Sequence, residues 1–202
     1  MVRPDAMQQQ MSALLAMTFK LINERGSAII QLTAAGAGEG TTTVAYELAR
    51  VAALSNWCKV SLIDAAPAWR GAPRPGGFDA PAGDEAELSL RPVQFGGASF
   101  AFGELNRTGD IGLQPDRIGK CCSWLRSNFT LVLVDCPPVL GSVDAANIAA
   151  IADGTILVIE AQKTGVTEVE RARDLLLQAG GTLFGVILNK RPKWPGFIEN
   201  LK

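Results

Sequence analysis

The sequence predicts an α/β domain with a doubly wound, mostly parallel sheet and helices on both faces, a three-layer α/β/α arrangement. Three observations predict it: continuous apolar runs of strand length, helical segments that alternate with them, and a glycine-rich turn after the first run. Strands that are covered on both faces are apolar throughout, whereas half-exposed strands alternate. The alternation of strand and helix in turn favours parallel strands joined by crossover helices.

The predicted elements follow one another along the chain in regular order. The expected strands are Ala28–Thr33, Val60–Asp64, Leu131–Asp135, Thr155–Glu160 and Leu183–Asn189. The expected helices are Thr42–Leu54, Pro115–Ser127, Asp144–Ile151 and Thr167–Ala179. Each helical segment has the 3.6-residue apolar period of a helix that packs one face against a sheet.

Two regions do not follow this alternation. Residues 1–26 are expected to form an N-terminal helical segment, whose apolar stripe serves either to dock on a partner or to pack against the chain's own domain. Residues 66–97 contain five prolines among many glycines and are expected to be a long loop, either a functional lid or a tolerated insertion. We assign the remaining chain, 27–202, to one domain that includes this loop.

Composition excludes several classes of function. The 202 residues are 48% hydrophobic and carry a net charge of −1, so the chain lacks the basic surface that nucleic-acid binding requires. The absence of histidine rules out serine triads built on histidine and histidine-ligated zinc. The most apolar N-terminal stretch, Met11–Phe19, is too short to span a bilayer and lacks the features of a signal peptide, so we expect a cytoplasmic protein.

A glycine-rich loop follows the first expected strand and leads directly into a helix, reading TAAGAGEGTTT over residues 33–43. The order of strand, glycine loop and helix is typical of a phosphate cradle, in which backbone N–H groups and the helix N-terminus face an anion. A plain tight turn between strand and helix is the alternative. The candidate phosphate-binding residues are Gly36, Gly38, Glu39, Gly40, Thr41, Thr42 and Thr43.

The lysine of a complete P-loop is missing, because Thr41 occupies the position after the last glycine. That lysine normally meets the β and γ phosphates as a point charge, which a threonine hydroxyl cannot replace. The loop is therefore expected to hold a diphosphate or an inorganic anion, and to stabilise a transferring phosphoryl group poorly. ATP or ADP with Mg²⁺ is the candidate cofactor, bound more weakly than in a complete P-loop, and no cofactor at all is the alternative.

Two of the expected strands end in aspartate. Asp64 and Asp135 both lie at the carboxyl edge of the sheet, where open α/β sheets bind their ligands. In a P-loop ATPase the second of these carboxylates belongs to the Walker B element and orients Mg²⁺. Thr42 and Asp135 are accordingly the candidate metal ligands, and Asp64 is a candidate catalytic residue. Capping of the next turn is the alternative role for both aspartates.

Taken together, these motifs resemble the cytoplasmic domain of the bacterial tyrosine kinases that regulate capsule and exopolysaccharide export, within the wider superfamily of deviant-Walker P-loop ATPases. The resemblance is closest over residues 115–192, which include LVLVDCPPVLGSVDAANIAAIADGTILVIEAQKT and GVILNKRP. It implies a P-loop NTPase fold, contact of Asn189 with the nucleotide base, and a membrane polysaccharide co-polymerase, or its cytoplasmic tail, as the partner. Through that partner the protein would lie at the inner membrane.

The sequence departs from the family pattern at the catalytic positions. Besides Thr41, Ala66 replaces the second aspartate of the Asp-x-Asp motif. The tyrosine-rich tail that the family phosphorylates is absent from this sequence, whose only tyrosine is Tyr46. The N-terminal helix also lacks the charged residues that the family uses for ring assembly, so homo-oligomerisation stays open but an octameric ring is not expected.

These departures predict a pseudokinase that acts as a scaffold or regulator. One alternative is a partitioning-type ATPase, although the signature lysine of that type is missing from the neighbourhood of Ala34 and Ala35. Another alternative is an active nucleotide enzyme or nucleotide-sensing switch that takes its cation from a partner or from Lys163, Lys190 or Arg191.

Overall fold

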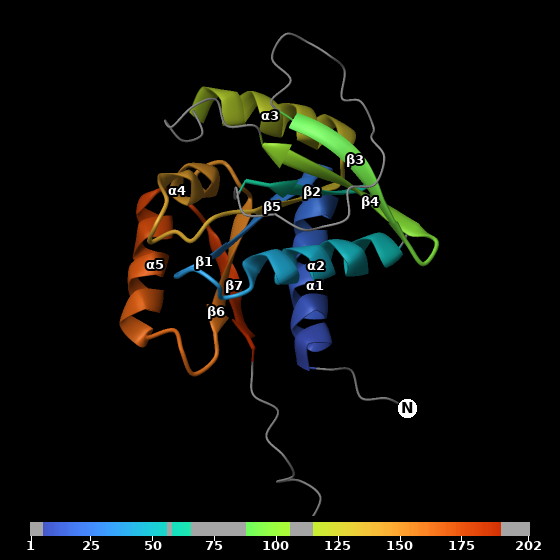
Figure 1. Cartoon of the computed structure of the whole chain (residues 1–202). Coiled ribbons are helices and arrows are strands. Elements are labelled where there is room, and N and C mark those ends of the chain that lie inside the picture. Colours follow the sequence, from blue (N-terminus) through green and yellow to red (C-terminus); the bar gives the residue numbers. More distant parts are fainter. Residues whose placement is uncertain (1–5, 56–57, 66–87, 106–114, 191–202) are drawn as a thin grey trace, which may run out of the picture.

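The computed structural model describes residues 6–55, 58–65, 88–105 and 115–190. The strands are β1 (Ala28–Ala34), β2 (Val60–Asp64), β3 (Leu88–Phe95), β4 (Ala98–Leu105), β5 (Leu131–Asp135), β6 (Gly154–Glu160) and β7 (Leu183–Asn189). The helices are α1 (Ala6–Arg25), α2 (Thr41–Leu54), α3 (Pro115–Asn128), α4 (Val143–Ala149) and α5 (Val166–Gln178). The strands form one sheet in the order β3-β4-β2-β5-β1-β6-β7 (Figure 1). The predicted doubly wound, mostly parallel fold is confirmed.

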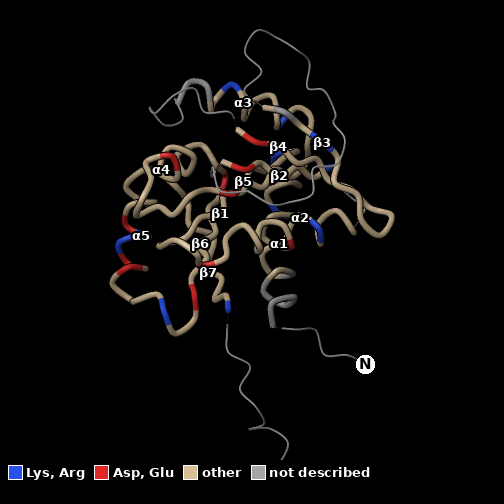
Figure 2. Tube along the Cα trace, viewed as in Figure 1, with Lys and Arg blue, Asp and Glu red and all other residues tan. Residues whose placement is uncertain are grey.

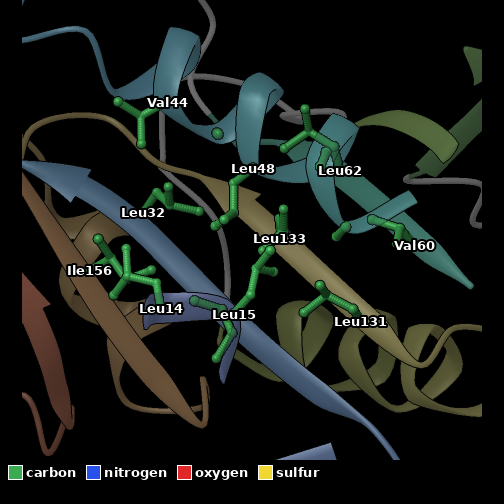
Figure 3. Close-up of a cluster of buried hydrophobic side chains, with 14 of the residues drawn as sticks. Leu14, Leu15, Leu32, Val44, Leu48, Val60, Leu62, Leu131, Leu133 and Ile156 are labelled. Carbon is green, nitrogen blue, oxygen red and sulfur yellow. The ribbon is translucent and has the colours of Figure 1, made fainter. Parts of the chain in front are cut away.

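Helices cover both faces of the sheet and produce two hydrophobic cores. One core joins α1 and α2 to the sheet, and the other joins α3, α4 and α5 to its opposite face. Successive residues of β1 alternate between them, since Ile29 belongs to the second core and Ile30 to the first. Figure 3 shows Val44 and Leu48 of α2 facing the central strands across the first core.

The central strands are buried along their whole length. Every residue of β1, β2 and β5 is buried, which explains why apolar residues predominate on both faces of these strands rather than alternating with polar ones. β1 pairs in parallel with β5 on one side and β6 on the other. The strand that leads into the glycine loop therefore occupies the middle of the sheet, where its position is fixed from both sides.

Residues 88–97 were expected to belong to the long loop, but they form β3 and the turn of a β-hairpin with β4. Leu88 and Leu90 are buried on one face, and Gly96 and Gly97 make the turn with positive φ angles of 50° and 82°. Pro92 is compatible with this strand because β3 lies at the edge of the sheet. Residues 66–87 of the expected loop lie outside the described residues.

The N-terminal helix packs against its own domain, which decides between the two roles expected for it. Leu14 and Leu15 are buried in the first core with Ile22, and Thr18 is buried beside them. None of the described helices is long and apolar enough to cross a membrane. Figure 2 shows both acidic and basic residues along α5.

Candidate functional site

The glycine loop connects the buried end of β1 to the first turn of α2. Gly38 and Gly40 have φ angles of 80° and 93°, a left-handed conformation that favours glycine. A Cβ atom at Gly40 would also collide with the side-chain amide of Asn189. Thr41, Thr42 and Thr43 form the start of α2, where backbone N–H groups have no partner within the helix. Sequence spacing therefore located the loop correctly.

Glu39 is buried in the loop, with only 5% of its surface exposed. Its Oε2 accepts a hydrogen bond from the backbone N–H of Ala35 at 3.0 Å, and its Oε1 accepts one from the Thr164 hydroxyl at 2.6 Å. The carboxylate thus ties the start of the loop to the turn between β6 and α5. The acidic side chain of Glu39 is therefore engaged within the protein.

Two residues at the end of β7 hold the loop through its carbonyl oxygens. Asn189 Nδ2 donates to the Glu39 carbonyl at 2.8 Å, and Lys190 Nζ donates to the Gly38 carbonyl at 2.5 Å. Lys190 also pairs with Glu160 at 3.0 Å, and Lys163 pairs with the same carboxylate at 3.1 Å. Hydrogen bonds from these two lysines hold the pKa of Glu160 below its usual range. The two described lysines considered as replacement cations therefore both have anionic partners.

The two strand-end aspartates lie on neighbouring strands. Asp64 and Asp135 are register partners in the parallel pair β2–β5. Asp135 is 2% exposed, and neither of its carboxylate oxygens has a hydrogen-bond partner in the described part of the chain. Burial, with the nearby Asp64 charge adding to it, raises the pKa of Asp135 to about 7, while the hydroxyl of Thr42 opposes the rise. Thr42 lies close enough for this effect without reaching hydrogen-bonding geometry.

This arrangement fits a Mg²⁺ ion that takes only part of its coordination from protein. Mg²⁺ prefers oxygen ligands and commonly uses one or two carboxylates together with water and substrate phosphates. Asp135 has two buried oxygens without partners, and Thr42 supplies a hydroxyl next to them. No group of three or more acidic, cysteine or histidine side chains among the described residues could hold a metal by itself.

The sequence did not predict two residues near the candidate site, Glu104 and Thr164. Glu104, at the end of β4, is the register partner of Asp64 and pairs with Arg91 at 3.1 Å. Its position depends on the β3–β4 hairpin, which the sequence pattern did not predict. Thr164 was also missed, because only the fold brings it to Glu39. Ala66 and Arg191 lie outside the described residues.

Tyr46, the only tyrosine of the chain, is part of the packing of α2. Its ring contacts Phe100 edge to face, with ring centroids 5.6 Å apart, and it is partly buried against the first core. A packed ring of this kind is less accessible to a kinase than a tyrosine in an extended tail. Within the described residues, the chain therefore offers no exposed tyrosine.

The fold and the glycine loop define the chain as a P-loop NTPase-like α/β domain. The ParA family ATPase of Chlorobium tepidum superposes on it with a TM-score of 0.55 over 81% of this chain and 74% of that chain, at 12% identity, which shows the common fold. The kinase domain of the Escherichia coli tyrosine kinase ETK superposes with a TM-score of 0.66 and 26% identity, covering 92% of this chain and 78% of that chain. The chain is thus similar in fold and in sequence to the kinase domain of a bacterial tyrosine kinase.

Sequence comparisons find similarity to the same group of proteins. The tyrosine-protein kinase CpsD of Streptococcus agalactiae is 36% identical over 78 residues, which cover 39% of this chain and 34% of CpsD. AmsA of Erwinia amylovora is 29% identical over 177 residues, which cover 80% of this chain and 23% of AmsA. The chain thus matches about a third or less of the length of these curated relatives. No family model matches the sequence.

Proposed function

We propose that this chain is a pseudokinase, a tyrosine kinase-like domain that acts as a scaffold or regulator of exopolysaccharide biosynthesis. The observation that carries this proposal is Thr41, which stands where the phosphate-binding lysine of a P-loop belongs. The loop around it keeps its glycines, its left-handed turns and its side-chain ties. A phosphate-binding loop that keeps its shape but lacks the lysine side chain is better suited to binding a nucleotide than to transferring its phosphoryl group.

The chemical partners follow from the same site. ADP or ATP with Mg²⁺ is the candidate ligand, with Thr42 and Asp135 holding the ion and Asn189 near the base. A bound Mg²⁺ would neutralise charge between the phosphates. The protein partner that we propose is a membrane polysaccharide co-polymerase or its cytoplasmic tail. This assignment rests on the resemblance to the bacterial tyrosine kinases, and it would place the domain at the cytoplasmic side of the inner membrane.

Turnover assays test this proposal. Purified protein would be incubated with labelled ATP and Mg²⁺, and both phosphate release and label transfer to protein would be measured. We expect neither from the natural chain, because Thr41 brings no charge to the γ phosphate. Thr41→Lys is the matched gain-of-function variant, and weak hydrolysis by it alone would support a site that is disabled at this position. Hydrolysis by the natural chain at a typical enzymatic rate would refute the pseudokinase role.

A nucleotide-sensing switch is the second candidate function. It is favoured by Asp135, whose buried carboxylate has no hydrogen-bond partner among the described residues. A nucleotide-bound cation that the carboxylate coordinates would compensate its buried charge. In this case nucleotide binding should depend on Mg²⁺ and should change the affinity for the partner. If Mg²⁺ does not alter ADP binding, this second function is excluded.

A further inference from the structure

The donors at the end of β7 contact two successive carbonyl groups of the glycine loop. Lys190 Nζ donates to the carbonyl of Gly38, and Asn189 Nδ2 donates to the carbonyl of Glu39. These carbonyls belong to the peptide units Gly38–Glu39 and Glu39–Gly40. All described peptide bonds are trans, so the C=O and N–H groups of each unit point in opposite directions. The N–H groups of Glu39 and Gly40 therefore point away from β7.

Residues 37 and 38 form a turn that brings the Glu39 N–H toward the Gly36 carbonyl, but neither the Glu39 nor the Gly40 N–H makes a hydrogen bond of good geometry within the described residues. Other polar atoms of the loop are bonded. A donor at a peptide carbonyl polarises the peptide and strengthens its N–H as a donor, and a charged donor does so most. Successive N–H groups in a glycine-rich turn also form a concave site for anions.

We propose that Lys190 and Asn189 are positioning residues that strengthen the Glu39 and Gly40 N–H groups as anion donors, so that the cradle binds a diphosphate without a lysine in the loop. Lys190 acts through the Gly38–Glu39 peptide, and Asn189 acts through the Glu39–Gly40 peptide. Glu39 stabilises the arrangement from inside, since its carboxylate is held by Ala35 and Thr164. This inference deepens the proposed function and rests on the anion-binding site assigned there.

Lys163 provides a matched control for Lys190. Both lysines donate to the same Glu160 oxygen, at 3.1 Å and 3.0 Å, and both are largely exposed, but the structure gives only Lys190 a bond to the loop. Lys163→Met and Lys190→Met thus each remove one positive charge. Each also removes one hydrogen-bond partner of the Glu160 carboxylate. A difference between the two variants reports the contact with Gly38 rather than the net charge of the region.

The first readout is the amide ¹⁵N resonance of the loop, which needs no ligand. Lys190→Met should shift the Glu39 amide, because it removes the donor from the preceding carbonyl, and Asn189→Ala should shift the Gly40 amide. Lys163→Met should shift neither. Thermal denaturation checks that each variant is folded. Equal shifts with Lys163→Met and Lys190→Met, or no shift with either, would overturn the proposal.

The second readout is calorimetric titration of the full chain with inorganic pyrophosphate and Mg²⁺, in the natural and the Thr41→Lys backgrounds. We expect Lys190→Met to weaken binding about 5- to 10-fold, as for a cation some 7 Å from the anion, and Lys163→Met to weaken it less than about 2-fold. Equal weakening by both variants contradicts the relay through Gly38. Failure of pyrophosphate to bind in either background overturns the anion-binding role, even where the amides respond. ATP hydrolysis by the natural chain, in contrast, overturns only the pseudokinase role.

Discussion

The glycine loop leaves no room for a side chain at residue 40. Gly40 combines a φ angle of 93° with a Cβ direction that points at the amide of Asn189. Asp135, at the end of β5, has no hydrogen-bond partner for its buried carboxylate among the described residues. At the scale of single residues, a steric clash therefore disfavours any side chain at Gly40. The burial of an unpaired charge makes the ionised form of Asp135 destabilising.

Gly40→Ala should destabilise the fold by about 2–4 kcal/mol, because left-handed strain and a steric clash add together. Gly26→Ala is the matched control, since Gly26 has a φ angle of 82° but nothing within 4 Å of the position that a Cβ atom would take, and should cost about 1 kcal/mol. Urea unfolding measures both. The double variant with Asn189→Ala should recover part of the loss, and equal costs for the two single variants would contradict the clash.

Asp135→Asn should stabilise the protein near pH 8 by about 1–3 kcal/mol when no Mg²⁺ is present. The pKa of Asp135 is raised from 3.8 to about 7 in the folded state, so the folded protein retains a proton that the unfolded chain loses. Stability therefore falls as pH rises from about 4 to about 7, and the cost is fully present above that window. Thermal unfolding from pH 3.5 to 8 should show the two proteins diverging with pH. Parallel curves would contradict a buried, unpaired carboxylate.

How much of the site the sequence could predict depends on the distance along the chain. Asp64 and Asp135 could be identified because each ends a recognisable strand, and parallel strands bring such ends together. The bond between Glu39 and Thr164 spans 125 residues and has no local signal. The contacts of the Glu39 carboxylate and of Lys190 could not be predicted from the sequence, because they depend on the positions of β6 and β7 in the folded sheet.

At the scale of elements, the same contrast separates the central strands from the edge hairpin. β1, β2 and β5 are buried on both faces, so their sequences are mostly apolar and recognisable as strands. β4 alternates between buried and exposed positions, and β3 contains Pro92 in a region rich in loop-forming residues. Composition therefore predicted a loop where β3 forms by pairing with β4, and the sequence pattern did not predict β4.

Helix α1 is an integral element of the first core, and substitutions on its two faces should show this. Leu15→Ala should cost about 2–4 kcal/mol, because Leu15 is 6% exposed and its loss leaves a cavity. Met17→Ala is the control on the outer face, where 48% of the residue is exposed, and should change stability by less than about 0.5 kcal/mol. Denaturant titration distinguishes them. Equal, small effects would mean that α1 is not part of the folded core.

Asp153 links three elements at the edge of the sheet opposite the glycine loop. It accepts hydrogen bonds from Arg25 at the end of α1, from Arg126 of α3, and from the backbone N–H of Ile29 in β1, each at 2.8 Å. Burial alone would raise the pKa of Asp153, but the bonds from Arg126 and Ile29 and the Arg126 charge outweigh it and hold the pKa below its usual range. The carboxylate thus stabilises the fold in its ionised form.

Asp153→Ala should destabilise the protein by about 1–3 kcal/mol at neutral pH, a range that allows for the partial exposure of both arginines. Because the folded pKa is lowered, this contribution is present above the unfolded pKa and disappears as pH falls through the folded value. Asp174→Ala, which breaks the exposed pair with Arg173, serves as a control and should have little effect. Urea unfolding at pH 7 that gives equal losses for both variants would argue against a structural role of Asp153.

At the scale of the whole molecule, the parallel sheet brings the ends of six strands to one edge. The glycine loop, Asp64, Asp135 and Asn189 meet there although they come from four different strands. The nucleotide site that we propose would lie at this edge, with Thr41 at the position of the P-loop lysine. We therefore propose that the glycine loop keeps the shape of a phosphate-binding loop but lacks its positive charge.

Calorimetric titration of ADP and ATP with Mg²⁺ into the natural chain and into Thr41→Lys tests this claim most directly. We expect weak or undetectable binding by the natural chain and clear binding by the lysine variant, about tenfold tighter or more, because the variant restores one charge-assisted contact to the phosphates. Equally tight binding of ATP by both proteins would contradict the claim, since the missing lysine would then not limit the site.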